Sequence, residues 1–198
     1  MNVYDFDKTI YNGDSTADFI IWETTKNPLL ALRLARGGFS FLMYKANLAS
    51  KTYYKEKIYY ILQHIPNIKS EVELFWDEHF KNIKKWYLDA KKDDDVIISA
   101  SPEFLLQPAM RRLGLKNLLA SSVDTPTGFY NGINCYGEEK VRRFKEKFSD
   151  EIDNFYSDSI SDKPLACLAK QAYLIEGDIL INWNPRTLKP SEQQGNSL

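Results

Sequence analysis

After residue 92, short apolar stretches typical of strands alternate with helical stretches, and this alternation limits the chain to few folds. Residues 96–98 (Val-Ile-Ile) form a continuous β-branched run, which is typical of a strand buried on both faces of a parallel sheet. The apolar spacing predicts further strands at 118–123, 154–157 and 172–175, and helices at 103–113, 138–148 and 162–170. Strands that alternate with helices in this way build a doubly wound, Rossmann-like parallel sheet, so we expect an α/β fold.

A long helical stretch separates the first strand, expected at residues 2–6, from the other strands. Between residues 16 and 91 the apolar side chains recur at intervals of three and four, as helices require. Helix breaks are expected at Asn27-Pro28, Gly37-Gly38 and Pro66.

This order of elements predicts one sheet domain with an insertion after its first strand. Residues 1–13 and 92–198 are expected to form the Rossmann-like core, and residues 14–91 an all-helical cap. Within the core, residues 129–135 predict a small hairpin around an Asn-Gly turn, and the polar tail from Lys189 is expected to fray.

Composition excludes several classes of protein. With 43% hydrophobic residues the chain is not wholly disordered. Its 26 Lys and Arg against 27 Asp and Glu give no overall electrostatic reason to bind nucleic acid, and no such partner is expected. Two cysteines are too few for a disulfide framework. Since the chain also starts without a basic, apolar leader, we expect a cytoplasmic protein.

Two carboxylates follow the first strand. In the string Asp5-Phe6-Asp7-Lys8-Thr9 the period of two places the side chains of Asp5 and Asp7 on the same face. Crowded carboxylates repel each other unless a cation is bound or one of them holds a proton. The alternative is a helix-capping turn that happens to be rich in aspartate.

Further polar residues occur at the ends of later strands or just beyond. Ser99 follows the run 96–98 and would present a hydroxyl and an N–H at the head of the next helix, which suits a phosphate, although Ser99 could simply cap that helix. Lys140 lies near the start of a helix, where the helix dipole disfavours a cation, but most lysines are merely solvated. Asp158 and Asp162 follow the strand at 154–157, where they could bind a hard cation or act as caps.

This ordered set of residues resembles the haloacid dehalogenase superfamily of phosphotransferases, and the helical insertion resembles the cap of its phosphoserine-phosphatase-like members (subfamily IB). The resemblance implies an Mg²⁺-dependent phosphomonoester hydrolase. Asp5 would be the nucleophile that forms an aspartyl-phosphate, and Asp7 the general acid and base. The other implied roles are Mg²⁺ binding by Asp5, Asp7, Asp158 and Asp162, and phosphate binding by Ser99 and Lys140 together with Thr9, which would also orient the motif.

The substrate is less constrained than the chemistry. Phosphoserine phosphatases usually carry a Glu shortly after the first motif, where this chain has Asp14, and a Ser-Gly-Gly stretch where it has Ser-Ala-Ser-Pro. The segments 99–102, 137–141 and 156–159 are more similar to those of bacterial phosphatidylglycerophosphatases C. These resemblances imply a phosphorylated small molecule, such as phosphoserine, or a phospholipid head group as the substrate.

The cap has an unusual charge balance. Residues 27–63 contain six basic side chains and one acidic one, a net charge of +5, interleaved with leucines and aromatic residues. This pattern suits peripheral contact with the anionic inner face of a membrane. The alternative is an amphipathic cap that packs its apolar stripe on the core.

A receiver domain or a non-enzymatic binding protein could also use clustered aspartates, a serine and a lysine. The order of the residues disfavours the receiver domain, because its acceptor is not followed by a helical insertion and its second acidic pair does not come late in the chain. A binding protein without activity remains an alternative.

Overall fold

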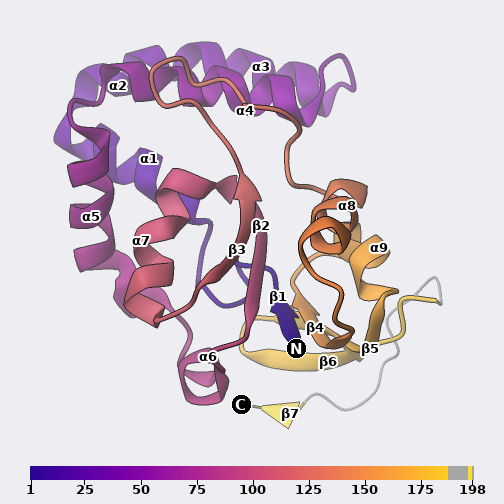
Figure 1. The fold of residues 1–198 in the computed structure, drawn as a ribbon. Coiled ribbons are helices and arrows are strands. Elements are labelled where there is room, and N and C mark those ends of the chain that lie inside the picture. The colour runs from indigo at the N-terminus through magenta and orange to yellow at the C-terminus, as the bar shows by residue number, and fades with distance from the viewer. Residues whose placement is uncertain (187–195, 198) are drawn as a thin grey trace.

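The computed structural model describes residues 1–186 and 196–197 and confirms the expected α/β architecture. Its sheet has the strand order β3-β2-β1-β4-β5-β6-β7 (Figure 1). The strands are β1 (Asn2–Tyr4), β2 (Val96–Pro102), β3 (Asn117–Ser121), β4 (Ile152–Ser157), β5 (Ala169–Glu176), β6 (Ile179–Trp183) and β7 (Asn196–Ser197). Strands β1 to β5 pair in parallel, and the strand order switches sides at β1, between β2 and β4. Such a switch is where ligands bind in open α/β sheets.

The sheet extends beyond residues 172–175, which the sequence pattern marked as the last strand. Strand β6 returns antiparallel to β5 through a two-residue turn, with Glu176 paired to Ile179. Gly177 opens this turn at a φ of +61°, a conformation that glycine adopts without strain. A Gly-Asp pair between two apolar runs is a hairpin signal, so this strand was detectable in the sequence. The tail from Lys189 lies outside the described residues except for β7.

Helices fill the segment between β1 and β2, as expected. They are α1 (Ser15–Lys26), α2 (Pro28–Arg33), α3 (Ala35–Lys45), α4 (Lys51–Tyr59), α5 (Ile68–His79) and α6 (Lys85–Ala90), with 3₁₀ turns at Tyr60–His64 and Phe80–Asn82. The breaks at Asn27-Pro28 and Pro66 are confirmed. In Figure 1, α2, α3 and α4 lie together at one end of the molecule and α5 runs down its side.

The break expected at Gly37-Gly38 is wrong, because α3 runs through both glycines and the chain bends at Leu34 instead. Each glycine costs about 1 kcal/mol in a helix. Contacts between α3 and α4 offset that cost: the ring of Tyr54 packs 5.2 Å from that of Phe41 and 5.8 Å from that of Tyr44.

The helices around the rest of the sheet are α7 (Glu103–Leu113), α8 (Glu138–Lys147) and the short α9 (Lys163–Ala166), which follows a 3₁₀ turn at Ile160–Asp162. The helix expected over 162–170 therefore ends early, because its last residues join β5. The hairpin expected at 129–135 is wrong as well. Only an isolated bridge joins Val123 to Tyr130, whose ring packs 5.8 Å from that of Tyr59 in the cap.

The two faces of the sheet bury alternate residues of the same strand. Val3 belongs to one apolar cluster and its neighbour Tyr4 to another, as the period of two requires. The cluster around Tyr4 includes Phe19 of α1 and Trp76 of α5, so the helical insertion packs directly on the sheet. This packing holds the start of α1 beside the carboxyl end of β1.

Candidate active site

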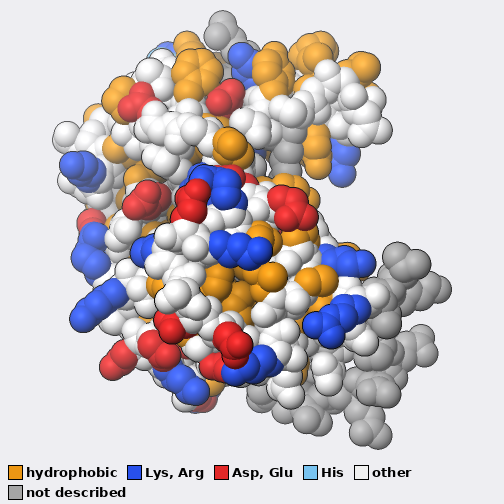
Figure 2. All heavy atoms as spheres, turned by 45° about the vertical axis from the view of Figure 1, so that its right-hand side comes forward, with side chains coloured by type: hydrophobic (Ala, Val, Ile, Leu, Met, Phe, Trp, Pro, Cys, Tyr) orange, Lys and Arg blue, Asp and Glu red, His pale blue; other side chains and the backbone are white. Residues whose placement is uncertain are grey.

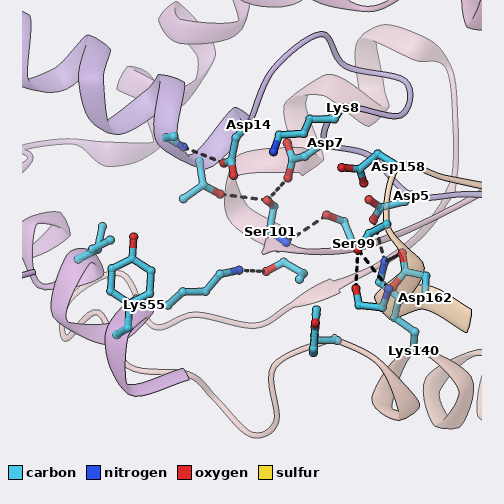
Figure 3. Close-up of a pocket in the computed structure, with 18 of the residues that line it drawn as sticks. Asp5, Asp7, Lys8, Asp14, Lys55, Ser99, Ser101, Lys140, Asp158 and Asp162 are labelled. Atoms are coloured by element: carbon cyan, nitrogen blue, oxygen red, sulfur yellow. Dashed lines mark hydrogen bonds and ion pairs between the residues drawn. The ribbon is translucent and has the colours of Figure 1, made fainter. Parts of the chain in front are cut away.

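The chain turns sharply after β1 and directs two carboxylates into one cavity. The N–H of Asp5 donates to the carbonyl of Tyr156 (2.8 Å), which extends the pairing of β1 with β4 by one residue. Phe6 is fully buried, and its carbonyl accepts two later backbone N–H groups at 3.0 Å. Asp5 and Asp7 flank this anchored residue, and both line the cavity (Figure 3).

The cavity, of about 350 Å³, lies at the carboxyl ends of β1, β2 and β4. Seven of the eight residues singled out in the sequence line it: Asp5, Asp7, Asp14, Ser99, Lys140, Asp158 and Asp162. The cap supplies the facing wall, with Thr16 and Ile20 from α1 and Tyr54 and Lys55 from α4. Residues from five separate stretches of the chain therefore meet between the sheet and the helical insertion.

Lys140 lies at the centre of the acidic cluster and is only 2% exposed. Its Nζ donates to Asp5 Oδ1 (2.8 Å) and to Asp162 Oδ2 (2.7 Å). The hydroxyl of Ser157 also donates to Asp162 Oδ2, at 2.7 Å. This lysine, near the start of α8, is therefore not solvated but buried between two carboxylates.

The cluster holds more negative charge than Lys140 alone balances. Burial raises the pKa of Asp5; Lys140 lowers it, but Asp162 and Asp158 raise it further. Burial likewise raises the pKa of Asp158. Burial by itself would lower the pKa of Lys140, yet the carboxylates of Asp5 and Asp162 outweigh it and raise that pKa, so the amine stays charged.

Asp7 lies in a different environment from Asp5. Its Oδ1 accepts the backbone N–H of Ser15 (2.7 Å) at the start of α1, and its Oδ2 accepts the hydroxyl of Ser101. Burial, followed by the charge of Asp14, raises the pKa of Asp7 to about 6 despite these hydrogen bonds. Asp7 is therefore a carboxyl that can gain and lose a proton near neutral pH, and its hydrogen bonds go to partners other than Lys140.

Ser99 lines the cavity, but not for the reason the sequence suggested. Strand β2 continues to Pro102, so Ser99 lies within the strand and not at the head of α7. Pro102, which makes no side-chain hydrogen bond, is the residue that caps α7. The hydroxyl of Ser99 instead accepts the backbone N–H of Ser101 at 3.0 Å. The pairing with β3 shifts register between Ile98 and Pro102, and this irregularity re-aims the strand end.

Thr9 and Asp14 take supporting positions. Thr9 is the one predicted site residue that is not part of the described cavity lining. It is fully buried, and its hydroxyl accepts the backbone N–H of Asp158 (2.9 Å). Thr9 thus holds the loop after β4 against the loop after β1. Asp14 lines the cavity but also caps α1, accepting the N–H of Ala17 at 3.0 Å.

The structure adds residues that the sequence reasoning did not assign. Ser101 binds Asp7 and lies two residues after Ser99, a spacing that could have pointed to it on an extended strand. Lys55 reaches the cavity from α4 and donates to the carbonyl of Ala100 at 2.9 Å. No local pattern marks Lys55, because its position depends on how the cap packs on the sheet.

The donor atoms of the cavity suit Mg²⁺. Asp162 Oδ1 is buried without a hydrogen-bond partner, and the carboxylates supply the hard oxygen ligands that this ion prefers. In residues 1–186 and 196–197, no group of three His, Cys, Asp or Glu side chains converges as a ligand set. Mg²⁺ does not require one, because it is commonly bound through one or two carboxylates and keeps several waters.

Comparison with known proteins agrees with this arrangement. The sequence profile of the haloacid dehalogenase-like hydrolase family matches residues 3–166. A Mycobacterium tuberculosis protein described as a "probable phosphatase" is 32% identical over 93 residues, which are 43% of this chain and 32% of that protein. The chain thus matches about a third of the length of this curated relative.

Two solved structures share the fold over most of the chain. A Bordetella pertussis protein of unknown function superposes with a TM-score of 0.71 at 22% identity, covering 87% of both chains. A phosphoserine phosphohydrolase-like protein from Francisella tularensis has a TM-score of 0.53 at 16% identity, covering 87% of this chain and 86% of the other. The predicted likeness of the fold to phosphoserine-phosphatase-like proteins is confirmed.

Proposed function

We propose a phosphatase function for this chain, which belongs to the haloacid dehalogenase-like hydrolase family. In this proposal it hydrolyses phosphate monoesters through an aspartyl-phosphate at Asp5. The observation that carries the proposal is the division of one cavity into two carboxyl environments. Asp5 is paired with the buried Lys140, whereas Asp7 is held by Ser101 and Ser15. Carboxyls in different environments can take different roles, here nucleophile and acid.

The reaction has two halves. A carboxylate oxygen of Asp5 attacks phosphorus, and its bond to phosphorus forms as the ester P–O bond breaks. Asp7 gives its proton to the departing alcohol oxygen. In the second half Asp7 takes a proton from water, whose oxygen attacks phosphorus, and the release of inorganic phosphate restores the carboxylate of Asp5. A pKa of about 6 lets Asp7 serve in both directions at neutral pH.

The other residues would hold the phosphoryl group and the loops around it. Lys140 neutralises the oxygens that carry negative charge as the bonds change, and Ser99 donates its hydroxyl to one of them. Thr9 contributes indirectly, because its hydrogen bond fixes the backbone at Asp158.

Mg²⁺ is the proposed cofactor. Asp5, the main-chain carbonyl of Asp7 and Asp158 would hold it, with Asp162 as a further ligand or as a support for the others. The ion would supply positive charge that lets the anionic ester approach an anionic nucleophile.

The division of the chain is also part of the proposal: residues 1–13 and 92–198 act as the catalytic core, and residues 14–91 as a cap that covers the substrate. The proposal is supported by the cavity, since its facing walls come from these two parts.

Among the described residues, no helix is long and apolar enough to cross a membrane.

For the substrate we propose a phosphorylated small molecule or the phosphate of a phospholipid head group. Phosphoserine is one candidate, because Asp14 lines the cavity and its carboxylate could meet an amine. A lipid phosphate is favoured by exposed apolar residues of the cap, which are described below.

The proposed function is tested with p-nitrophenyl phosphate, a monoester that needs no specific leaving-group contacts. We expect phosphate release in the presence of Mg²⁺, a loss of more than about 100-fold in EDTA, and recovery when Mg²⁺ is added back in excess, because charge neutralisation at the phosphoryl group is lost and regained. A folded protein without turnover on this substrate, phosphoserine and phosphatidylglycerophosphate would instead indicate a binding module. Turnover that is indifferent to EDTA would contradict the metal assignment.

A further inference from the structure

The cap exposes a group of large apolar side chains that we call the cap patch: Leu29, Leu32, Phe39, Leu42 and Leu48. Each of them is 65–75% exposed, whereas their neighbour Leu30 is buried. The expectation that this apolar stripe packs on the core is therefore wrong for most of its residues. Figure 2 shows hydrophobic and basic side chains over this end of the molecule, with acidic side chains near them. A surface of this kind, on helices α2 and α3 and the loop after them, requires a partner to cover it.

The chain segment that carries the cap patch holds charges of one sign. Residues 27–55 contain no Asp or Glu. Basic side chains lie over aromatic rings nearby, with Lys45 Nζ 5.5 Å from the ring centre of Phe41 and Lys57 Nζ 4.9 Å from that of Tyr53. The carboxylate of Glu56 accepts the backbone N–H of Tyr130 at 3.3 Å and so is engaged with the core. The partner that covers the patch must therefore be apolar and anionic at once.

We propose that the cap patch docks on an anionic lipid surface, with its leucines and Phe39 among the acyl chains and basic side chains near it, such as Lys45, among the head groups. Helices with apolar residues beside basic ones bind such interfaces. A second copy of this chain fits less well, because a two-fold contact would place the same positively charged patch against itself. The charge pattern of residues 27–55 thus decides between the two occupants.

Docking there would place the helices that wall the cavity next to the lipid surface. Tyr54 lines the cavity and stacks on Tyr44 of α3, with the rings 9° from parallel. The ring of Phe41, on the same helix, also packs against that of Tyr54, with the ring centres 5.2 Å apart. The docking surface and the cavity wall are therefore joined through one aromatic cluster. This step rests on the proposed function, although lipid binding itself requires no catalysis.

The test is flotation of the full chain with vesicles of phosphatidylcholine alone or mixed with an equal amount of phosphatidylglycerol. We expect binding to the mixed vesicles at low salt, little binding to phosphatidylcholine, and release at high salt, because exposed charges are screened. The double variant Leu32→Glu, Leu42→Glu should bind the mixed vesicles at least about tenfold more weakly. Leu74→Glu is the matched control, since Leu74 is an exposed helical leucine (49%) in α5, outside the patch, and it should float like the unmodified chain.

Three further readings separate this inference from the proposed function. The double variant should keep its turnover of soluble p-nitrophenyl phosphate but lose turnover of phosphatidylglycerophosphate presented in vesicles. Flotation of a chain that shows no phosphatase activity would contradict the proposed phosphatase function and would still support the lipid-docking proposal. The docking proposal would be overturned if the double variant and Leu74→Glu float equally. It would also be overturned if no form of the chain floats and light scattering finds a dimer that the double substitution dissociates.

Discussion

Asp5→Asn loses phosphatase turnover by more than about 10⁴-fold, because an amide oxygen does not attack phosphorus and the remaining groups have no nucleophile to assist. The change is close to isosteric, and the amide oxygen can still accept from Lys140. It also removes one of several crowded negative charges, so the variant should unfold at the same temperature as the unmodified chain or higher. Turnover of p-nitrophenyl phosphate and the thermal midpoint are measured on the same preparation.

Asp150→Asn is the control for this substitution, because Asp150 is exposed and lies in the loop before β4, away from the cavity. It should leave both turnover and the thermal midpoint unchanged. Mg²⁺-dependent turnover by Asp5→Asn within tenfold of the unmodified chain would show that another group is the nucleophile.

Lys140→Met is expected to reduce both activity and stability. The buried ammonium balances Asp5 and Asp162, and a thioether in its place leaves those two buried carboxylates without a cation. Removing one partner of a buried ion pair costs about 3 kcal/mol or more. Turnover should fall by about 10²–10³-fold, since the charge on the phosphoryl oxygens is no longer neutralised.

Urea unfolding without added metal measures the loss of stability, and initial rates with saturating Mg²⁺ measure the loss of turnover. Lys145→Met is the matched control, because Lys145 is an exposed lysine of the same helix. If Lys140→Met unfolds at the same urea concentration as this control, the buried lysine is not needed to balance the acidic cluster.

The meeting of Asp5, Lys140 and Asp162 was predictable in part from the sequence. Asp5 and Asp162 follow β1 and β4, and parallel neighbours bring their carboxyl ends to one edge of the sheet. Lys140 stood out because a cation near a helix start is unfavourable unless something else requires it. In these cases local pattern and strand order together determine where the side chain lies.

Other features of the structure depend on tertiary packing, which a short sequence pattern does not predict. The sequence spacing of Leu32 and Leu42 identifies apolar positions but not which of them the core buries, and both are exposed. Gly37 and Gly38 were expected to break a helix, but α3 runs through both of them, because contacts with α4 stabilise it. Lys55 reaches the cavity only because α4 lies across the end of β2, a tertiary arrangement.

In the proposed reaction, Asp5 carries the phosphoryl group between the two halves. The most direct measurement mixes the chain rapidly with a phosphomonoester and Mg²⁺, quenches with acid, and reduces the product with borohydride, which converts an acyl phosphate to an alcohol. Peptide mapping should find homoserine in place of aspartate at position 5 in a fraction of the molecules, and none in a sample quenched without substrate. Rapid turnover with an unmodified Asp5, or with the reduced residue at Asp7 or Asp158, would show that Asp5 is not the nucleophile.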